Sequence, residues 1–512
     1  MSGGRAGPNG GAASSTAIDD LPPFSPGRRV AVTVGVLTGT ALAAVEATVV
    51  SAAMPTVVAS LGGLEHYTWV FSSYLLASTV TVPLWGKLSD LYGRRRLYQA
   101  GILLFLAGSW LCGISGSMEQ LVAARVLQGF GAGGLIPLGM TIIADVHDVG
   151  GRARVQGLFS SVWGLASVVG PPAGGYITEA LSWRWVFFLN LPVGGVAATI
   201  IGLALREPRR TSRPSIDFLG AATFTAGLTA LLFGLAGAND PRHLLEPGRL
   251  ATLAAGAAFV ATFVAVERRA VDPLVPPGLL RDPVVATAVV SGFLAGMAMF
   301  GAVSFVPLYA QGVLGTTPAG AGATLTALML GWVTFSVVGG RLLLRVGPRH
   351  TILSGFFLLT AGFIALTLHR PDAWRGWLHA ELGTIGAGLG LTMMTLVVAV
   401  QQVVPRERLG VSTSVAQLSR AIGGAAGVAL MGLVLASALA RGGPAGGVDL
   451  SALVRREARV ALPVALRQDL QQALASALSR VFGLCALSSG LAFAVAWRWL
   501  PPGRVADGPP SH

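Results

Sequence analysis

Long runs of apolar residues recur along nearly the whole chain, separated by short segments rich in Gly, Pro and Arg. A bilayer core of about 30 Å is crossed by about 20 apolar residues in a helix, and these runs reach that length. The pattern predicts an all-α integral membrane protein with fourteen transmembrane helices. The expected helices are 30–54, 67–86, 97–115, 119–144, 155–177, 185–205, 217–237, 249–267, 285–311, 320–343, 351–369, 378–404, 410–438 and 478–500.

Composition agrees with a membrane protein, since 53% of the residues are hydrophobic and only 12% are charged. Soluble domains carry about 25% charged residues. The net charge of +13 resides in short loops, without the basic and aromatic stripe of a nucleic-acid surface. The spans hold no catalytic triad and no phosphate loop, and Cys112 and Cys485 lack metal-ligand spacing. We therefore expect a protein that is not an enzyme, binds no nucleic acid and needs neither metal nor cofactor.

The distribution of basic residues predicts the orientation. With the N-terminus placed inside, 23 of the 36 lysines and arginines fall on the inner side and 11 on the outer side. Cytoplasmic loops carry such an excess. We expect a multi-pass protein of the inner (plasma) membrane with both termini cytoplasmic. Residues 1–28 and 501–512 are Gly- and Pro-rich and are expected to be cytoplasmic tails, the first of them disordered.

Two loops are degenerate copies of one another. Aligning Gly93 with Gly347 also aligns Gly86 with Gly340 and Arg95 with Arg349. The repeat predicts two six-helix halves, with helices 7 and 8 as an inserted pair. The expected division is 29–206, 207–283 and 284–500, the last including an outer loop at 439–477. Repeated halves are typical of secondary transporters, which bind their substrates between the halves near the midplane.

The first of these loops, from Gly86 to Arg96, reads GKLSDLYGRRR. It resembles the signature loop of the major facilitator superfamily. Asp90 ends a helix beside guanidinium groups, so a charge-assisted link could hold the cytoplasmic side closed in the outward-facing state. The alternative is a solvated loop whose arginines only set the topology. The residues of this expected cytoplasmic gate are Gly86, Asp90, Gly93, Arg94 and Arg95.

Two charged residues lie inside predicted helices of the first half. Glu46 is followed by ATVVSAAMP in a segment that resembles the first-helix motif of the fourteen-helix drug:proton antiporters, in which an Asp usually occupies this position. Desolvation at membrane depth disfavours the charged carboxylate, so Glu46 is expected to carry the proton. Arg125 matches a family arginine linked with proton transfer and is expected to help release that proton. The alternatives are a permanent ion pair for Glu46 and an outer-surface position for Arg125.

The helix 155–177 contains closely spaced glycines around Pro171. It resembles the antiporter motif of the same superfamily, which implies export. Small residues allow close helix approach, and a proline bends the helix. The motif residues are Gly164, Gly170, Pro171, Gly174 and Gly175.

Four further segments resemble the same antiporter family, beginning near Trp69, Trp183, Pro307 and Gly410, so the resemblance extends from about residue 30 to 440. It implies proton-coupled export of small apolar or cationic compounds, including antibiotics, by a carrier that is expected to be a monomer embedded in the lipid bilayer. A lipid or lipid-conjugate exporter on the same scaffold stays open as the alternative. Aromatic and Met side chains suit varied apolar ligands. The expected substrate-binding residues are Tyr74, Trp163, Met297, Phe300, Trp332, Met393 and Gln401.

Overall fold

The computed structural model describes residues 25–63, 66–147, 149–205, 218–235, 246–269, 278–371, 374–404, 409–442, 453 and 463–501. Within these ranges the chain is helical and contains no strand. Ten of the described helices are long and apolar enough to cross a membrane. Of the expected tails, 1–28 and 501–512, residues 1–24 and 502–512 lie outside the described residues, and α1 already begins at Pro26.

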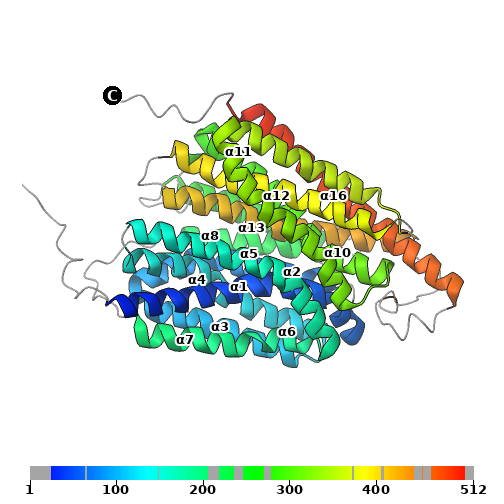
Figure 1. Cartoon of the computed structure of the whole chain (residues 1–512), viewed down its shortest axis with the longest axis horizontal. Helices are drawn as coiled ribbons and strands as arrows, with labels where there is room; N and C mark the ends of the chain where they lie inside the picture. Colours follow the sequence, from blue (N-terminus) through cyan, green and yellow to red (C-terminus); the bar gives the residue numbers. More distant parts are fainter. Residues whose placement is uncertain are drawn as a thin grey trace, which may run out of the picture.

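The first helix group comprises the helices before residue 205 and forms one side of the bundle (Figure 1). Two further helices follow it along the chain. The members of the first group are α1 (Pro26–Leu61), α2 (Tyr67–Tyr92), α3 (Arg94–Ile114), α4 (Met118–Val146), α5 (Val149–Ala180), α6 (Arg184–Phe188) and α7 (Asn190–Ala204). The two helices that follow are α8 (Phe218–Leu235) and α9 (Pro247–Glu267).

The second helix group lies along the other side of the bundle in Figure 1. It begins with a short 3-10 turn and includes one π-helical turn. Its elements are η3 (Leu279–Arg281), α10 (Pro283–Leu308), the π-turn η4 (Tyr309–Val313), α11 (Pro318–Thr367), α12 (Arg375–Val403), α13 (Leu409–Gly442) and α16 (Val464–Trp499).

Helix starts follow the sequence through capping residues. The side chain of Ser117 accepts a hydrogen bond from the backbone N–H of Gln120 at the start of α4. Asp282 caps α10 in the same way, and Thr317 caps α11, each directly before a proline. Such side chains satisfy backbone donors that have no partner in the first helical turn, and proline is tolerated there.

Gly93 and Gly347 adopt the same unusual backbone conformation. Their φ angles are 94° and 83°, a region that favours glycine because it has no Cβ atom. Gly93 separates α2 from α3, and Gly347 interrupts the helical geometry inside α11, directly before Pro348. The equivalence inferred from the two loop sequences is therefore matched by equivalent backbone turns.

The two helix groups contact one another through a few elements. Helix α5 packs against both α1 and α11, and α2 packs against α13. Helix α8 packs on α9 and also touches α2 and α13, with Leu228 of α8 buried between Val80 and Ala425. Helix α8 therefore covers the seam between the two groups.

The distribution of polar and apolar side chains is that of a protein surrounded by lipid. Large apolar side chains such as Leu203, Val337 and Leu344 are exposed, whereas Glu46, Arg125 and Gln128 are buried. In a soluble monomer, contiguous exposed apolar surface is rare. Buried polar groups together with an apolar exterior agree with the predicted membrane location.

One element prediction is corrected by the structure. The segment 439–477 is not all loop, because α13 continues to Gly442 and α16 already begins at Val464. Residues 464–477 are rich in Ala, Leu and Gln, which favour helix, and Leu470 and Leu474 are buried. The expected helix 185–205 corresponds to α6 and α7, which are separated only by Leu189 and together form one apolar span. The expected helices 320–343 and 351–369 correspond to the two parts of α11 on either side of the kink at Gly347.

Candidate transport site

Glu46 and Arg125 form an ion pair in the interior of the first helix group. Glu46 comes from the middle of α1 and Arg125 from α4, and their exposed fractions are 1% and 2%. Arg125 Nη1 donates a hydrogen bond to Glu46 Oε1. Its Nε donates to the carbonyl oxygen of Val70 at 3.2 Å, and its guanidinium lies 4.1 Å from the centre of the Tyr74 ring. Arg125 is therefore an interior residue, and the outer-surface position considered for it is excluded.

Three uncharged polar side chains complete this network. Arg125 Nη1 also donates to Gln128 Oε1 at 2.7 Å. Asn190, the first residue of α7, donates through Nδ2 to Glu46 Oε2 at 2.7 Å and to Ser109 Oγ at 2.8 Å. Gln128 Nε2 donates to Ser109 Oγ at 3.2 Å. Both oxygens of the carboxylate therefore accept a hydrogen bond from a neighbouring helix.

The sequence interpretation did not assign roles to Gln128, Asn190 and Ser109. A signal was present, because polar residues inside membrane spans are costly and usually face a partner. Gln128 also follows Arg125 by three positions, which places both on the same face of a helix. Asn190 could not be paired with Glu46 in this way, because its position depends on the break at Leu189 and on the packing of α7 against α1.

The ion pair between Glu46 and Arg125 allows both charges to be buried, because each side chain provides the opposite charge for the other. Removing an ion from water costs several kcal/mol, and a buried pair offsets this cost through close contact and additional hydrogen bonds. Protonation of Glu46 would cancel the charge of the carboxylate and leave the Arg125 guanidinium without its anion. The network therefore has two states of different net charge.

The glycines of α5 bring this helix into close contact with α1 and α11. A Cβ atom on Gly170 would lie 2.1 Å from Thr48 Oγ1, and one on Gly174 would lie 2.5 Å from the carbonyl oxygen of Val49. On Gly175 it would lie 2.3 Å from the carbonyl oxygen of Pro318. Pro171 lies in the same interface, since its carbonyl oxygen is 2.1 Å from a Cβ built on Gly322 of α11. These positions require the absence of a side chain.

Gly164, the remaining residue of the α5 motif, differs from the others. The nearest atom to a Cβ built there belongs to Val333 of α11, at 3.7 Å. The distance corresponds to ordinary van der Waals contact. Among the four motif glycines of α5, the close approach therefore involves Gly170, Gly174 and Gly175 and not Gly164.

Hydrogen bonds between the two helix groups lie near the end of the bundle at which α1 ends, which we call the Leu61 end. Gln311 of the π-turn donates to the carbonyl oxygen of Ala52 at 2.9 Å, and Thr56 donates to Gln311 Oε1 at 3.2 Å. The Tyr67 hydroxyl donates to the carbonyl oxygen of Ser304. Together with the α5 glycines, these contacts close the Leu61 end.

The expected cytoplasmic gate lies at the opposite end. Arg94 forms an ion pair with Asp145 of α4 and donates to the carbonyl oxygen of Thr141 at 2.9 Å. A Cβ on Gly86 would meet no atom within 4 Å. The side chain of Asp90 lies outside the described residues, so its expected link to Arg94 and Arg95 stays a prediction.

The expected substrate-binding residues occupy different environments. Tyr74 lies beside Arg125, and the α10 residues Met297 and Phe300 pack against Gly427 and Gly424 of α13. Tyr74, Met297 and Met393 are buried, Trp163, Phe300 and Trp332 are half-buried, and Gln401 is exposed.

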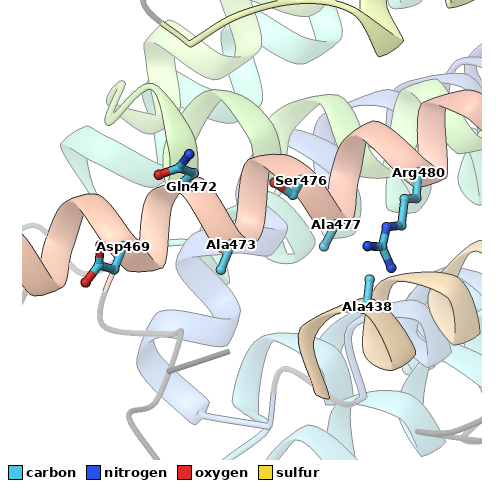
Figure 2. Close-up of a pocket in the computed structure, with 7 residues that line it drawn as sticks. All are labelled: Ala438, Asp469, Gln472, Ala473, Ser476, Ala477 and Arg480. Atoms are coloured by element: carbon cyan, nitrogen blue, oxygen red, sulfur yellow. The ribbon is translucent and has the colours of Figure 1, made fainter. Parts of the chain in front are cut away.

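A cavity of about 500 Å³ lies elsewhere, between the end of α13 and the first half of α16 (Figure 2). Its lining includes Ala438, Asp469 and Arg480, and none of the expected substrate-binding residues. Among the described residues no group of three or more His, Cys, Asp or Glu side chains is placed to hold a metal ion.

Comparison with known proteins decides the family. Residues 36–428 match the model of the Major Facilitator Superfamily. The chain belongs to this superfamily. The transporter is 36% identical to the multidrug transporter protein MdtP of Bacillus subtilis over 80% of its own length and 75% of that relative. It is also 34% identical to the uncharacterized MFS-type transporter Rv1877 of Mycobacterium tuberculosis, over 98% and 74% of the two chains.

Solved structures agree on the fold of this transporter. A bacterial homologue of the human lysosomal transporter Spinster, in an inward-facing and unoccupied conformation, matches with a TM-score of 0.67 at 15% identity. The match covers 94% of this chain and all of the other. The xylose transporter XylE from E. coli matches with a TM-score of 0.59 at 12% identity, over 93% and 98% of the chains. The family match and the relatives named as multidrug transporter and multidrug resistance proteins make this protein a membrane transporter, and its family is in general one of transporters and not of enzymes.

Proposed function

We propose that this transporter exports small apolar or cationic compounds in exchange for protons by alternating access. The observation that carries the proposal is the buried network of Glu46, Arg125 and Asn190. A carboxylate inside a membrane span is costly and is typical of proton relays and substrate pathways. The multidrug names of several relatives support the same class of cargo.

Glu46 is the proposed proton carrier, and Arg125 is the group that favours its charged form. In the deprotonated state the carboxylate is held by hydrogen bonds from Arg125 and Asn190. Protonation releases Arg125, and this change of partners can bias the equilibrium between two carrier conformations. Binding of the proton and of the substrate then alternates, which makes the exchange obligatory.

We further propose that the structure corresponds to the inward-facing state. With the N-terminus cytoplasmic, the Leu61 end is the outer end, and contacts between α1, α5, the π-turn and α11 close it. Interfaces of this kind have two discrete arrangements, so outward opening must break these contacts. In the outward-facing state, the loop that contains Asp90 would hold the cytoplasmic end closed.

The proposed topology has fourteen crossings in two halves, 29–206 and 284–500, with an inserted pair between them. The kink at Gly347 supports this count, because it divides the 50 residues of α11 into two segments, each long enough to cross a bilayer. The position of α8 over the seam supports a separate role for α8 and α9.

The test uses inside-out membrane vesicles with an imposed proton gradient and rhodamine 123 as the transported dye. Glu46→Gln should abolish proton-driven accumulation of the dye, because an amide side chain does not bind a proton near neutral pH. Glu46→Asp should retain transport, because the carboxylate is preserved. If Glu46→Gln vesicles still accumulate dye against its gradient, Glu46 is not the coupling residue, and Asp145 and Glu381 become the next candidates.

A further inference from the structure

A second arginine lies inside the membrane-spanning part of the chain, on α13. The side chain of Arg420 is half-buried and runs along Gly296 of α10, where a Cβ atom would stand 3.1 Å from it. Its Nη2 donates to Gln417 Oε1, one turn earlier on the same helix. Its Nη1 points at Met393 Sδ of α12, at 3.6 Å.

Arg420 differs from Arg125 in the partners it finds. Arg125 meets a carboxylate, an amide oxygen and a carbonyl oxygen. Among the described residues, Arg420 has no carboxylate within ion-pair distance, and one of its two acceptors is a thioether sulfur. A guanidinium has five N–H donors, and a thioether is a weak acceptor. The described part of the chain therefore accepts hydrogen bonds from only some of the Arg420 donors.

Apolar residues of two neighbouring helices, α12 and α10, lie near Arg420. Met393 of α12 contacts the guanidinium directly. On α10, Phe293, Met297 and Phe300 lie against the glycines of α13 that follow Arg420 in the chain. The three glycines are Gly423, Gly424 and Gly427. The guanidinium is thus in contact with Met393, and Met297 and Phe300 lie within about one helical turn of the α10 residue Gly296 that contacts Arg420. Methionine and phenylalanine side chains accommodate apolar ligands of varied shape.

The charges of the interior favour an anion at this place. Glu46 and Arg125 neutralise one another, so Arg420 contributes a positive charge that no described side chain balances. The half-buried guanidinium has no anionic partner among the described residues, and a bound carboxylate would both pair with it and accept hydrogen bonds from its free donors.

We propose that Arg420 binds an anionic group of the transported compound, so that the preferred substrates are apolar, aromatic molecules carrying one carboxylate or sulfonate. This assignment rests on the proposed proton-driven export and adds an acidic group to the apolar or cationic compounds proposed above as its substrates. The aromatic part of the compound lies against Met297, Phe300 and Met393, and its acidic group receives hydrogen bonds from the guanidinium.

Two dyes with the same ring system test the proposal. Rhodamine 110 carries a free carboxylate, and rhodamine 123 is its methyl ester. Binding to purified protein and export in inside-out vesicles are measured for both. The parent protein should bind rhodamine 110 about tenfold more tightly than rhodamine 123, as expected for a charge-assisted hydrogen bond. Arg420→Gln should lose this preference, with rhodamine 110 export falling more than rhodamine 123 export, and Arg420→Lys should keep part of the preference.

A matched control separates the role of the guanidinium from that of net charge. Arg268→Gln removes the same charge at an exposed position after α9 and should leave the preference unchanged. Equal loss of both dyes in a correctly folded Arg420→Gln variant, or an unaltered preference, would overturn the assignment. If the parent protein exports neither dye under a proton gradient, the proposed export function fails. Export of rhodamine 123 without any preference for rhodamine 110 contradicts the Arg420 assignment alone.

Discussion

Asn190 donates a hydrogen bond to the carboxylate of Glu46 at 2.7 Å, across 144 positions of the sequence. A hydrogen bond to a charged group contributes about 1.5–3 kcal/mol. Asn190→Ala should therefore lower proton-driven export by about tenfold or more, while the protein still inserts into the membrane. The measurement is dye accumulation in inside-out vesicles at matched protein levels.

Thr199→Ala on the same helix is the control for this prediction. Its hydroxyl donates only to the carbonyl oxygen of Gly195, one turn earlier, and is exposed. It should export at the parent rate. Unaltered coupling in Asn190→Ala would show that Arg125 alone positions the carboxylate.

Gly175→Ala should impair closure of the Leu61 end. The added methyl group would lie 2.3 Å from a backbone oxygen of α11, and inserting a methyl group into a packed interface costs about 1–3 kcal/mol. Export should fall by about fivefold or more. Gly164→Ala is the comparison, because the nearest atom there is 3.7 Å away, and it should remain close to the parent protein. Equal effects of the two substitutions would argue against a specific role for the close contact.

Gln311→Leu should make the Leu61 end open more often. The substitution removes both hydrogen bonds that join the π-turn to α1, each contributing about 1 kcal/mol. A cysteine at Ala52, which is fully buried, reports the opening through its reaction with a membrane-impermeant maleimide. We expect labelling about tenfold faster in Gln311→Leu.

The background for this experiment is low, because Cys112 and Cys485 are buried. Gln99→Leu serves as the control, since Gln99 donates to Ala198 within the first helix group. It should label at the parent rate. A Gln311→Leu variant that labels no faster would indicate that the α5 glycines are sufficient to hold this end closed.

Asp90→Asn should lower the export rate without affecting folding or insertion. Opening of the cytoplasmic side is expected to break a link between Asp90 and the arginines after Gly93, and partly exposed contacts of this kind contribute about 1 kcal/mol or less. The expected reduction is therefore about fivefold or less, measured as initial export rate. Glu246→Gln, which alters an exposed ion pair with Arg249 on α9, should have no effect. An Asp90→Asn variant with the export rate of the parent protein would contradict the expected link between Asp90 and the arginines after Gly93.

Much of the fold followed from the sequence, because each membrane helix satisfies its own backbone hydrogen bonds and needs only a sufficient apolar run. The observed bounds of α4 and α12 agree with the expected ranges to within a few residues, and α2 begins at the expected residue. Gly93 and Gly347 were paired from local loop patterns, and their shared backbone conformation reflects a local preference of glycine. Helix bounds and glycine turns are determined mainly by residues that are close to one another in the sequence.

What the sequence could not decide were partners between distant helices. That Asn190 reaches Glu46 while Arg420 reaches no carboxylate among the described residues depends on how α7, α10 and α12 are packed and rotated. The same holds for closure of the Leu61 end, which joins α1, α5 and the π-turn across the two helix groups. Apolar length places a helix in the membrane, but the direction that each of its faces takes is set by the neighbours it packs against.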